Sequence, residues 1–133
     1  MSEPTRATPD PAFQAWFAKV DTEDIFISTL TIGEIRRGLA RLPDGRRREQ
    51  VERLQASLLH RFADQIIPVD VAVAETWGGL SAALRAQGRV IGAVDELIAA
   101  TAIDRNLTLV TRNRRHFEPT GCALLSPWSD PTA

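Results

Sequence analysis

The apolar residues of this chain recur in blocks with two different spacings, and short turns separate the blocks. Apolar positions three to four residues apart predict helices over residues 31–42, 51–62 and 73–84. A shorter helix is expected after Asp10-Pro11, because aspartate caps helices and proline suits their first turn. The segment 95–103 is apolar on almost all sides, so the helix that it forms should be buried.

Short apolar runs without helical spacing alternate with these helices. They cover residues 25–27, 66–69, 107–110 and 123–125. Runs of this length suit strands that are covered on both faces, as in a parallel sheet. The alternation of strands and helices predicts a three-layer α/β/α fold with a mostly parallel sheet. A chain of 133 residues is expected to form one domain, over residues 1–133.

Composition narrows the setting of the protein. The single cysteine, Cys122, excludes an internal disulfide and a cysteine-based zinc site, so a cytoplasmic protein is expected. No apolar run approaches the roughly 18 residues that a membrane-spanning helix needs. Sixteen Lys and Arg residues against seventeen Asp and Glu residues give a net charge of −1. Any contact with nucleic acid must therefore be local.

The basic residues are nearly all arginine, and most of them cluster in three places. The clusters are Arg36, Arg37 and Arg41; Arg46, Arg47 and Arg48; and Arg112, Arg114 and Arg115. The first two clusters are interpreted as solvated helix faces. The third comes directly after an expected strand, which is a frequent place for functional residues in a parallel α/β fold.

Polar residues come after two of the expected strands and begin the buried helix. They are Glu34 after the first strand, Asp95 at the head of the helix, and Thr111 and Asn113 after the strand that ends at Val110. The carboxyl ends of parallel strands meet at one edge of a sheet, so these residues are expected to share one rim. Two carboxylates there suit magnesium, which prefers oxygen ligands. Such a site would support phosphodiester hydrolysis by a metal-activated water.

Each of these residues also has a purely structural interpretation. Thr31 and Glu34 match a capping box, in which the glutamate reaches back to the threonine amide. Asp95 matches an N-cap that the helix dipole stabilises. His116 is of a type found more often on surfaces and in turns than as a ligand. The residues alone leave both interpretations open.

Three segments occur in the order typical of the VapC branch of the PIN-domain family. They are residues 25–38 (IFISTLTIGEIRRG), 95–102 (DELIAATA) and 109–113 (LVTRN), the last followed by Phe117. The chain resembles this family over nearly its whole length. The resemblance implies a PIN-like fold and an endoribonuclease that depends on Mg²⁺ or Mn²⁺. It also implies the toxin of a type II toxin–antitoxin system, which hydrolyses phosphodiester bonds in structured RNA such as tRNA or rRNA.

The same resemblance implies roles for the polar residues. Glu34 and Asp95 would bind the metal, and Thr111 and Asn113 would support them in the same pocket. Arg112, Arg114 and Arg115 would lie at its mouth and contact RNA phosphates. A VapB-type antitoxin is the implied protein partner, and a homodimer is the implied assembly.

The sequence departs from the family in two places. Family members begin with a central apolar strand that ends in a metal-binding aspartate, and Ser2-Glu3 here resembles the segment directly after that strand. We therefore expect the first central strand to be missing. His116 stands where the family usually has an aspartate, and as an auxiliary ligand it suits magnesium poorly.

Two other functions stay open at this point. The first is a catalytically inactive PIN-like module that binds a VapB-type antitoxin, which the missing aspartate and His116 both favour. The second is a receiver or small-molecule binder that shares only the α/β architecture.

Overall fold

Side-chain caps set where two of the long helices begin in this computed structural model. The structure describes residues 11–128. Ser28 caps helix α2 (Thr29–Arg41), because its Oγ accepts a hydrogen bond from the Leu30 amide at 3.1 Å. Asp70 caps helix α4 (Val71–Ala86) in the same way and accepts from the Val73 amide at 2.9 Å. Both caps satisfy backbone donors that the first turn of a helix leaves without partners.

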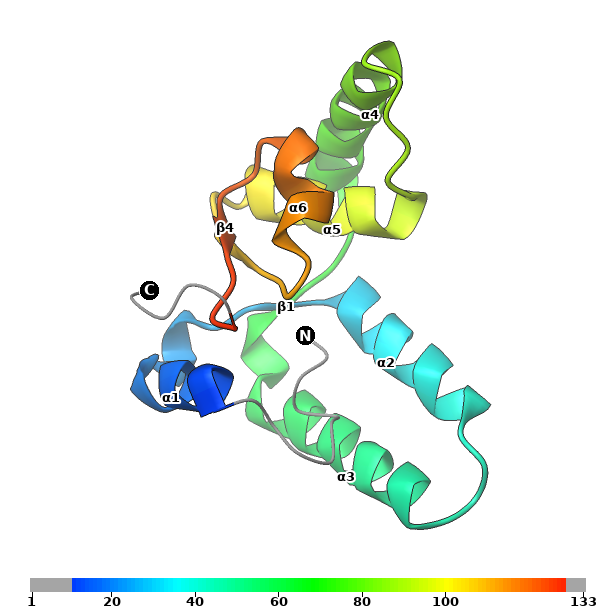
Figure 1. The fold of residues 1–133 in the computed structure, drawn as a ribbon, viewed down its shortest axis with the longest axis vertical. Coiled ribbons are helices and arrows are strands. Elements are labelled where there is room, and N and C mark those ends of the chain that lie inside the picture. Colours follow the sequence, from blue (N-terminus) through cyan, green and yellow to red (C-terminus); the bar gives the residue numbers. More distant parts are fainter. Residues whose placement is uncertain (1–10, 129–133) are drawn as a thin grey trace. The chain divides into compact units, whose positions relative to one another are not determined.

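The chain divides into two compact units, Met1–Ile67 and Pro68–Ala133, and each is described by itself. The elements of the first unit are α1 (Pro11–Lys19), η2 (Thr22–Asp24), β1 (Ile27–Ser28), α2, α3 (Arg46–Arg61), η3 (Ala63–Gln65) and β2 (Ile66–Ile67). Strands β1 and β2 pair in parallel, with Ile27 opposite Ile66. Helices α2 and α3 form a helical hairpin (Figure 1). The buried apolar side chains of this unit are Phe13, Leu39, Val51, Phe62 and Ile67.

The second unit repeats the combination of a parallel strand pair with helices. Its elements are α4, α5 (Ala93–Asp104), β3 (Leu109–Val110), α6 (Arg114–Phe117), η4 (Glu118–Thr120) and β4 (Leu124–Leu125). Strands β3 and β4 are parallel, with Leu109 opposite Leu124. Helices α4 and α5 make the most extensive helix contact in this unit (Figure 1). Its buried apolar side chains are Val73, Leu84, Ala99, Ala100, Ala102 and Phe117.

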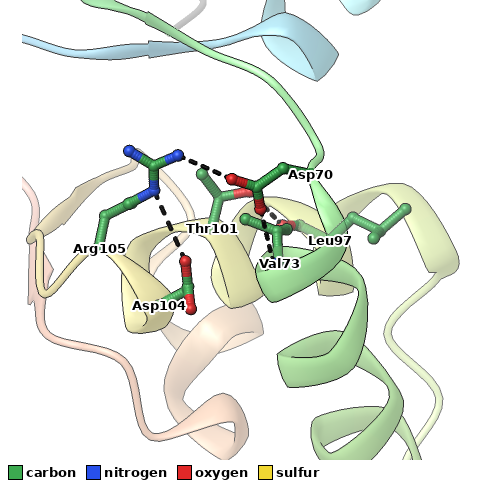
Figure 2. A network of polar contacts seen from close by, with 6 residues as sticks. All are labelled: Asp70, Val73, Leu97, Thr101, Asp104 and Arg105. Carbon is green, nitrogen blue, oxygen red and sulfur yellow. Dashed lines mark hydrogen bonds and ion pairs between the residues drawn. The ribbon is translucent and has the colours of Figure 1, made fainter.

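A small polar network joins the start of α4 to the end of α5 (Figure 2). Arg105 Nη2 lies 3.0 Å from Asp70 Oδ2, and Arg105 Nε lies 3.5 Å from Asp104 Oδ2. The Val73 amide, and after it the Arg105 guanidinium, lowers the pKa of Asp70 below its ordinary value. The Thr101 hydroxyl donates to the Leu97 carbonyl at 2.8 Å within α5. The two helices are therefore held together at the end opposite to the head of α5.

The predicted helices and the parallel pairing of the strands are confirmed, with shorter strands than expected. Strand β2 ends before Pro68, because proline has no amide hydrogen to donate to the neighbouring strand. Phe26 is 46% exposed, so the prediction that the strand over residues 25–27 is covered on both faces is wrong at this side chain. Within residues 11–128, no helix has the length and apolar character to cross a bilayer. The expected cap Asp10 and the segment Ser2-Glu3 lie outside the described residues.

Candidate active site

Asp95 lies in the first turn of α5. This helix is buried at Glu96 and over residues 99–102, whereas Ile103 is 39% exposed, so the prediction that the segment 95–103 is buried is wrong at Ile103. Gly92 occupies the cap position with φ 112°, a backbone conformation that favours glycine, and the helix begins at Ala93. The interpretation of Asp95 as an N-cap is therefore wrong. The Asp95 side chain is 34% exposed, whereas Ala99 and Ala100 further along α5 are fully buried. Helix α5 thus presents a carboxylate to solvent on a rigid support.

His116 contacts this carboxylate from α6. Its Nε2 lies 2.9 Å from Asp95 Oδ2. An ionised carboxylate only accepts hydrogen bonds, so Nε2 of His116 is the donor. The ring of Phe117, which is buried, meets the imidazole edge-on with centroids 5.1 Å apart. These contacts hold the Asp95 carboxylate through its Oδ2 atom.

Thr111 and Asn113 form the turn between β3 and α6. The Thr111 amide donates to the Leu125 carbonyl at 3.0 Å, and the Thr111 hydroxyl accepts from the Asn113 amide at 3.1 Å. The Asn113 carbonyl then accepts from the His116 amide at 3.2 Å. This turn leads into α6, from which His116 contacts Asp95. A direct role of Thr111 and Asn113 at an ion stays a prediction.

Glu34 is an exposed residue in the second turn of α2, in the first unit. Because Ser28 caps this helix, Thr31 lies inside it, and the interpretation of Thr31 and Glu34 as a capping box is wrong. Capping of α2 therefore does not explain why a glutamate occupies position 34. Asp95 belongs to the second unit, and the joint action of these two carboxylates at one ion stays a prediction.

The three arginines of the third cluster directly precede His116 in the sequence, and all three are exposed. Arg112 stacks its guanidinium over the Trp128 ring, 5.7 Å from the centroid. Arg115 lines an open hollow of about 420 Å³, whose other lining residues are Arg89, Glu118 and Pro119. The role of Arg112, Arg114 and Arg115 in RNA binding stays a prediction.

The donor atoms around Asp95 fit a divalent ion that keeps several of its waters. Within residues 11–128, no three His, Cys, Asp or Glu side chains gather into a closed metal cage. Mg²⁺ and Mn²⁺ are commonly held by one or two carboxylates, with water and substrate phosphate as the other ligands. The carboxylate of Asp95 is a ligand of the kind that such an ion takes, whereas Nε2 of His116 is engaged with that carboxylate.

Glu96 is a neighbour of the site that the sequence analysis treated only as part of an apolar helix. Its side chain is 8% exposed, and its Oε1 accepts a hydrogen bond from Trp77 Nε1 on α4 at 3.2 Å. The signal in the sequence was an acidic residue inside an apolar run, preceded by a tryptophan on the neighbouring helix. This bond anchors the first turn of α5, which carries Asp95, to α4.

Replacement of Glu96 should weaken this anchor. We expect Glu96→Ala to lower the free energy of unfolding by about 1–3 kcal/mol, because it leaves the Trp77 indole donor without its acceptor. Glu96→Gln should cost less, since its amide oxygen still accepts. Urea unfolding of the three proteins measures both effects, and equal stabilities of the alanine and glutamine variants would show that the bond contributes nothing.

Comparison with known proteins adds a family context to this geometry. A sequence model of the PIN domain matches residues 6–121, which spans parts of both units. The chain is 36% identical over 131 residues to Toxin FitB of Neisseria gonorrhoeae, covering 98% of this chain and 94% of that protein. It is 35% identical over 129 residues to VapC ribonuclease Y4jK of Sinorhizobium fredii, covering 96% and 92%. The crystal structure of FitAcB from Neisseria gonorrhoeae superposes with a TM-score of 0.87 at 36% identity, over 96% of this chain and 93% of that chain.

Proposed function

Because this chain belongs to the PIN domain family, in its VapC-type toxin branch, we propose that it is a metal-dependent endoribonuclease of a type II toxin–antitoxin system. It acts on structured RNA in the cytoplasm and is silenced by a VapB-type antitoxin. The observation that carries the proposal is the partly exposed carboxylate of Asp95, which His116 orients at the head of a buried helix. Relatives similar in sequence over nearly the whole chain are named as a toxin and as a ribonuclease.

The residues of the chain have separable roles in this proposal. Asp95 and Glu34 would hold a Mg²⁺ or Mn²⁺ ion, and the hydrogen bond from His116 would fix the orientation of the Asp95 carboxylate. Thr111 and Asn113 form the turn that supports this pocket. A bound divalent ion supplies a water of lowered pKa and neutralises charge on the scissile phosphate. The exposed guanidinium groups of the third arginine cluster position the RNA backbone.

The direct test is RNA cleavage by the purified chain with and without divalent metal. We expect tRNA to be cut with Mg²⁺ or Mn²⁺, and excess EDTA to lower the rate at least about 100-fold until metal is restored. Addition of the cognate antitoxin should stop the reaction and form a stable complex. Persistent integrity of tRNA and rRNA with either metal would refute the nuclease.

One observation favours a second candidate, a PIN-like module without catalysis. His116 already occupies one oxygen of Asp95, at the position where the family usually has a further carboxylate. Such a module would bind the antitoxin without cutting RNA. Antitoxin titration by calorimetry then shows binding while the cleavage assay stays blank.

His116 provides a further prediction. Removal of a side chain that orients a metal ligand typically weakens metal affinity about 10- to 100-fold, so we expect His116→Ala to do so for Mn²⁺. His60→Ala is the matched control, because His60 is exposed on α3 in the first unit. Electron paramagnetic resonance of free Mn²⁺ measures both affinities. Unchanged Mn²⁺ binding by His116→Ala would mean that the contact with Asp95 serves the fold alone.

A further inference from the structure

One face of α2 carries arginines beside the candidate metal ligand. Glu34, Arg37 and Arg41 are three and four residues apart, a spacing that places side chains on the same side of a helix. All three are exposed, whereas Leu39, which points to the other side, is 1% exposed. The face that presents Glu34 therefore continues into two guanidinium groups.

The same charge continues across the turn of the hairpin. Arg46 and Arg47 are exposed in the first turn of α3, and Arg36 is exposed on the flank of α2. Figure 1 shows that α2 and α3 meet at this turn. Residues 36–48 hold six arginines and one aspartate, in a chain whose net charge is −1. Positive charge is thus concentrated on this hairpin although the whole molecule is slightly acidic.

One of the six arginines, Arg48, stabilises the turn of the hairpin. Arg48 Nη1 donates to the Leu42 carbonyl at 3.1 Å and lies 3.8 Å from Asp44, and Arg48 Nε lies 3.3 Å from Glu52. No described residue forms an ion pair or a side-chain hydrogen bond with the other five. Arg37 and Arg41 moreover repel each other across one turn, which destabilises a helix. These guanidinium groups are therefore available to an external anion.

We propose that Arg37, Arg41, Arg46 and Arg47, with Arg36 on the flank, bind the phosphate backbone of the RNA on one side of the scissile bond. We name this set the arginine track. The inference rests on the proposed function, because Glu34 at one end of the track marks the site of cleavage. The helix rises about 10 Å from Glu34 to Arg41, so the arginine track extends beyond a single phosphate group.

The chemistry of the track favours RNA over an acidic protein segment. Arginine binds phosphate through two parallel hydrogen bonds, and a row of such groups matches a repeating phosphate backbone. Contacts of this kind position a nucleic acid without selecting its sequence. The arginine track therefore contributes to RNA affinity and to the position of the RNA along the protein. It does not select the sequence that is cleaved.

The experiment measures binding of fluorescein-labelled tRNA by anisotropy, with the full chain kept in EDTA so that RNA is bound without being cut. The test variant replaces Arg37, Arg41, Arg46 and Arg47 with glutamine. We expect at least about 30-fold weaker binding, and a decrease of about 3 in the slope of log affinity against log salt between about 50 and 200 mM, because each lost phosphate contact removes somewhat less than one unit.

Two variants separate the track from general effects. Replacement of the same four arginines with lysine keeps the charge and should retain most of the salt slope. Arg48→Gln breaks the contacts inside the turn and should lower the melting temperature while tRNA affinity stays near that of the unchanged chain. Thermal melting of the fourfold glutamine variant checks that it is folded, as the exposure of all four positions leads us to expect.

The outcomes distinguish this inference from the proposed function. Unchanged tRNA affinity and salt slope in the fourfold glutamine variant overturn the track, even if the chain cleaves RNA. Loss of antitoxin binding with intact tRNA binding also overturns it and assigns the arginines to a protein partner. If the chain never cleaves RNA but the variant still loses tRNA binding, the track stands and the nuclease is refuted.

Discussion

Asp95→Asn should abolish metal-dependent RNA cleavage, with a fall of at least about 100-fold in rate, because a neutral amide is a much weaker ligand for a hard divalent cation. The substitution preserves the shape of the side chain, and its amide oxygen still accepts the hydrogen bond from His116. The fold should therefore remain intact. Cleavage of tRNA under single-turnover conditions measures the loss of activity. Electron paramagnetic resonance of Mn²⁺ measures the accompanying loss of metal affinity.

Asp104→Asn is the matched control for this change. Asp104 lies on the same helix, α5, and its carboxylate pairs only with the adjacent Arg105 among the contacts of Figure 2. We expect its cleavage rate and Mn²⁺ affinity to stay within about threefold of the unchanged chain, because a solvent-accessible ion pair contributes little. An Asp95→Asn protein that keeps full activity would remove Asp95 from the proposed mechanism.

Glu34→Gln should produce the second large loss of activity, again at least about 100-fold, if Glu34 completes the ion site with Asp95. No structural role is evident for this residue, because it is exposed in the second turn of α2 and Ser28 performs the capping. Stability should therefore change by less than about 0.5 kcal/mol. Cleavage of tRNA and urea unfolding of the same preparation give both values.

The control for Glu34 is Glu49→Gln, an exposed acid in the first turn of α3 in the same unit. Both substitutions remove one negative charge from the helical hairpin, so a general electrostatic effect on RNA binding would appear in both proteins. Only the ligand role predicts a loss confined to Glu34→Gln. Equal rates in the two variants would contradict the prediction that two carboxylates share the ion.

Periodicity in the sequence was sufficient to predict the helices, because the spacing of apolar residues reports directly which side of a helix is buried. Leu39, Val51, Val73 and Leu84 lie at such positions, and all four are buried. The pattern was less informative for strands, since two paired residues give too short a pattern to distinguish their faces. For this reason the sequence predicted a covered Phe26, and the structure shows that it is exposed.

Some features of the candidate site could likewise be predicted from the sequence, and others could not. The placement of Thr111 and Asn113 after β3 could be inferred from the order of strands and helices, because a parallel arrangement puts such loops at strand ends. The placement of Asp95 at the head of α5 could be inferred from the apolar run that follows it. The contact of His116 with Asp95 joins residues 21 positions apart, and no local pattern announces it. The bond from Trp77 to Glu96 likewise depends on how two helices pack.

Local patterns in the chain thus predicted the helices and their apolar faces, the parallel strands and the family, and they suggested the candidate ligands, whose role stays a prediction. The tertiary structure decided which residues cap the helices, a question that the sequence patterns had left open. It assigned the cap of α2 to Ser28 rather than to Thr31 and the cap of α5 to Gly92 rather than to Asp95. It also brought His116 to Asp95 and Trp77 to Glu96. The physical reason for these two contacts is range, because apolar spacing acts within one or two helical turns, whereas these hydrogen bonds join segments that are distant in the sequence.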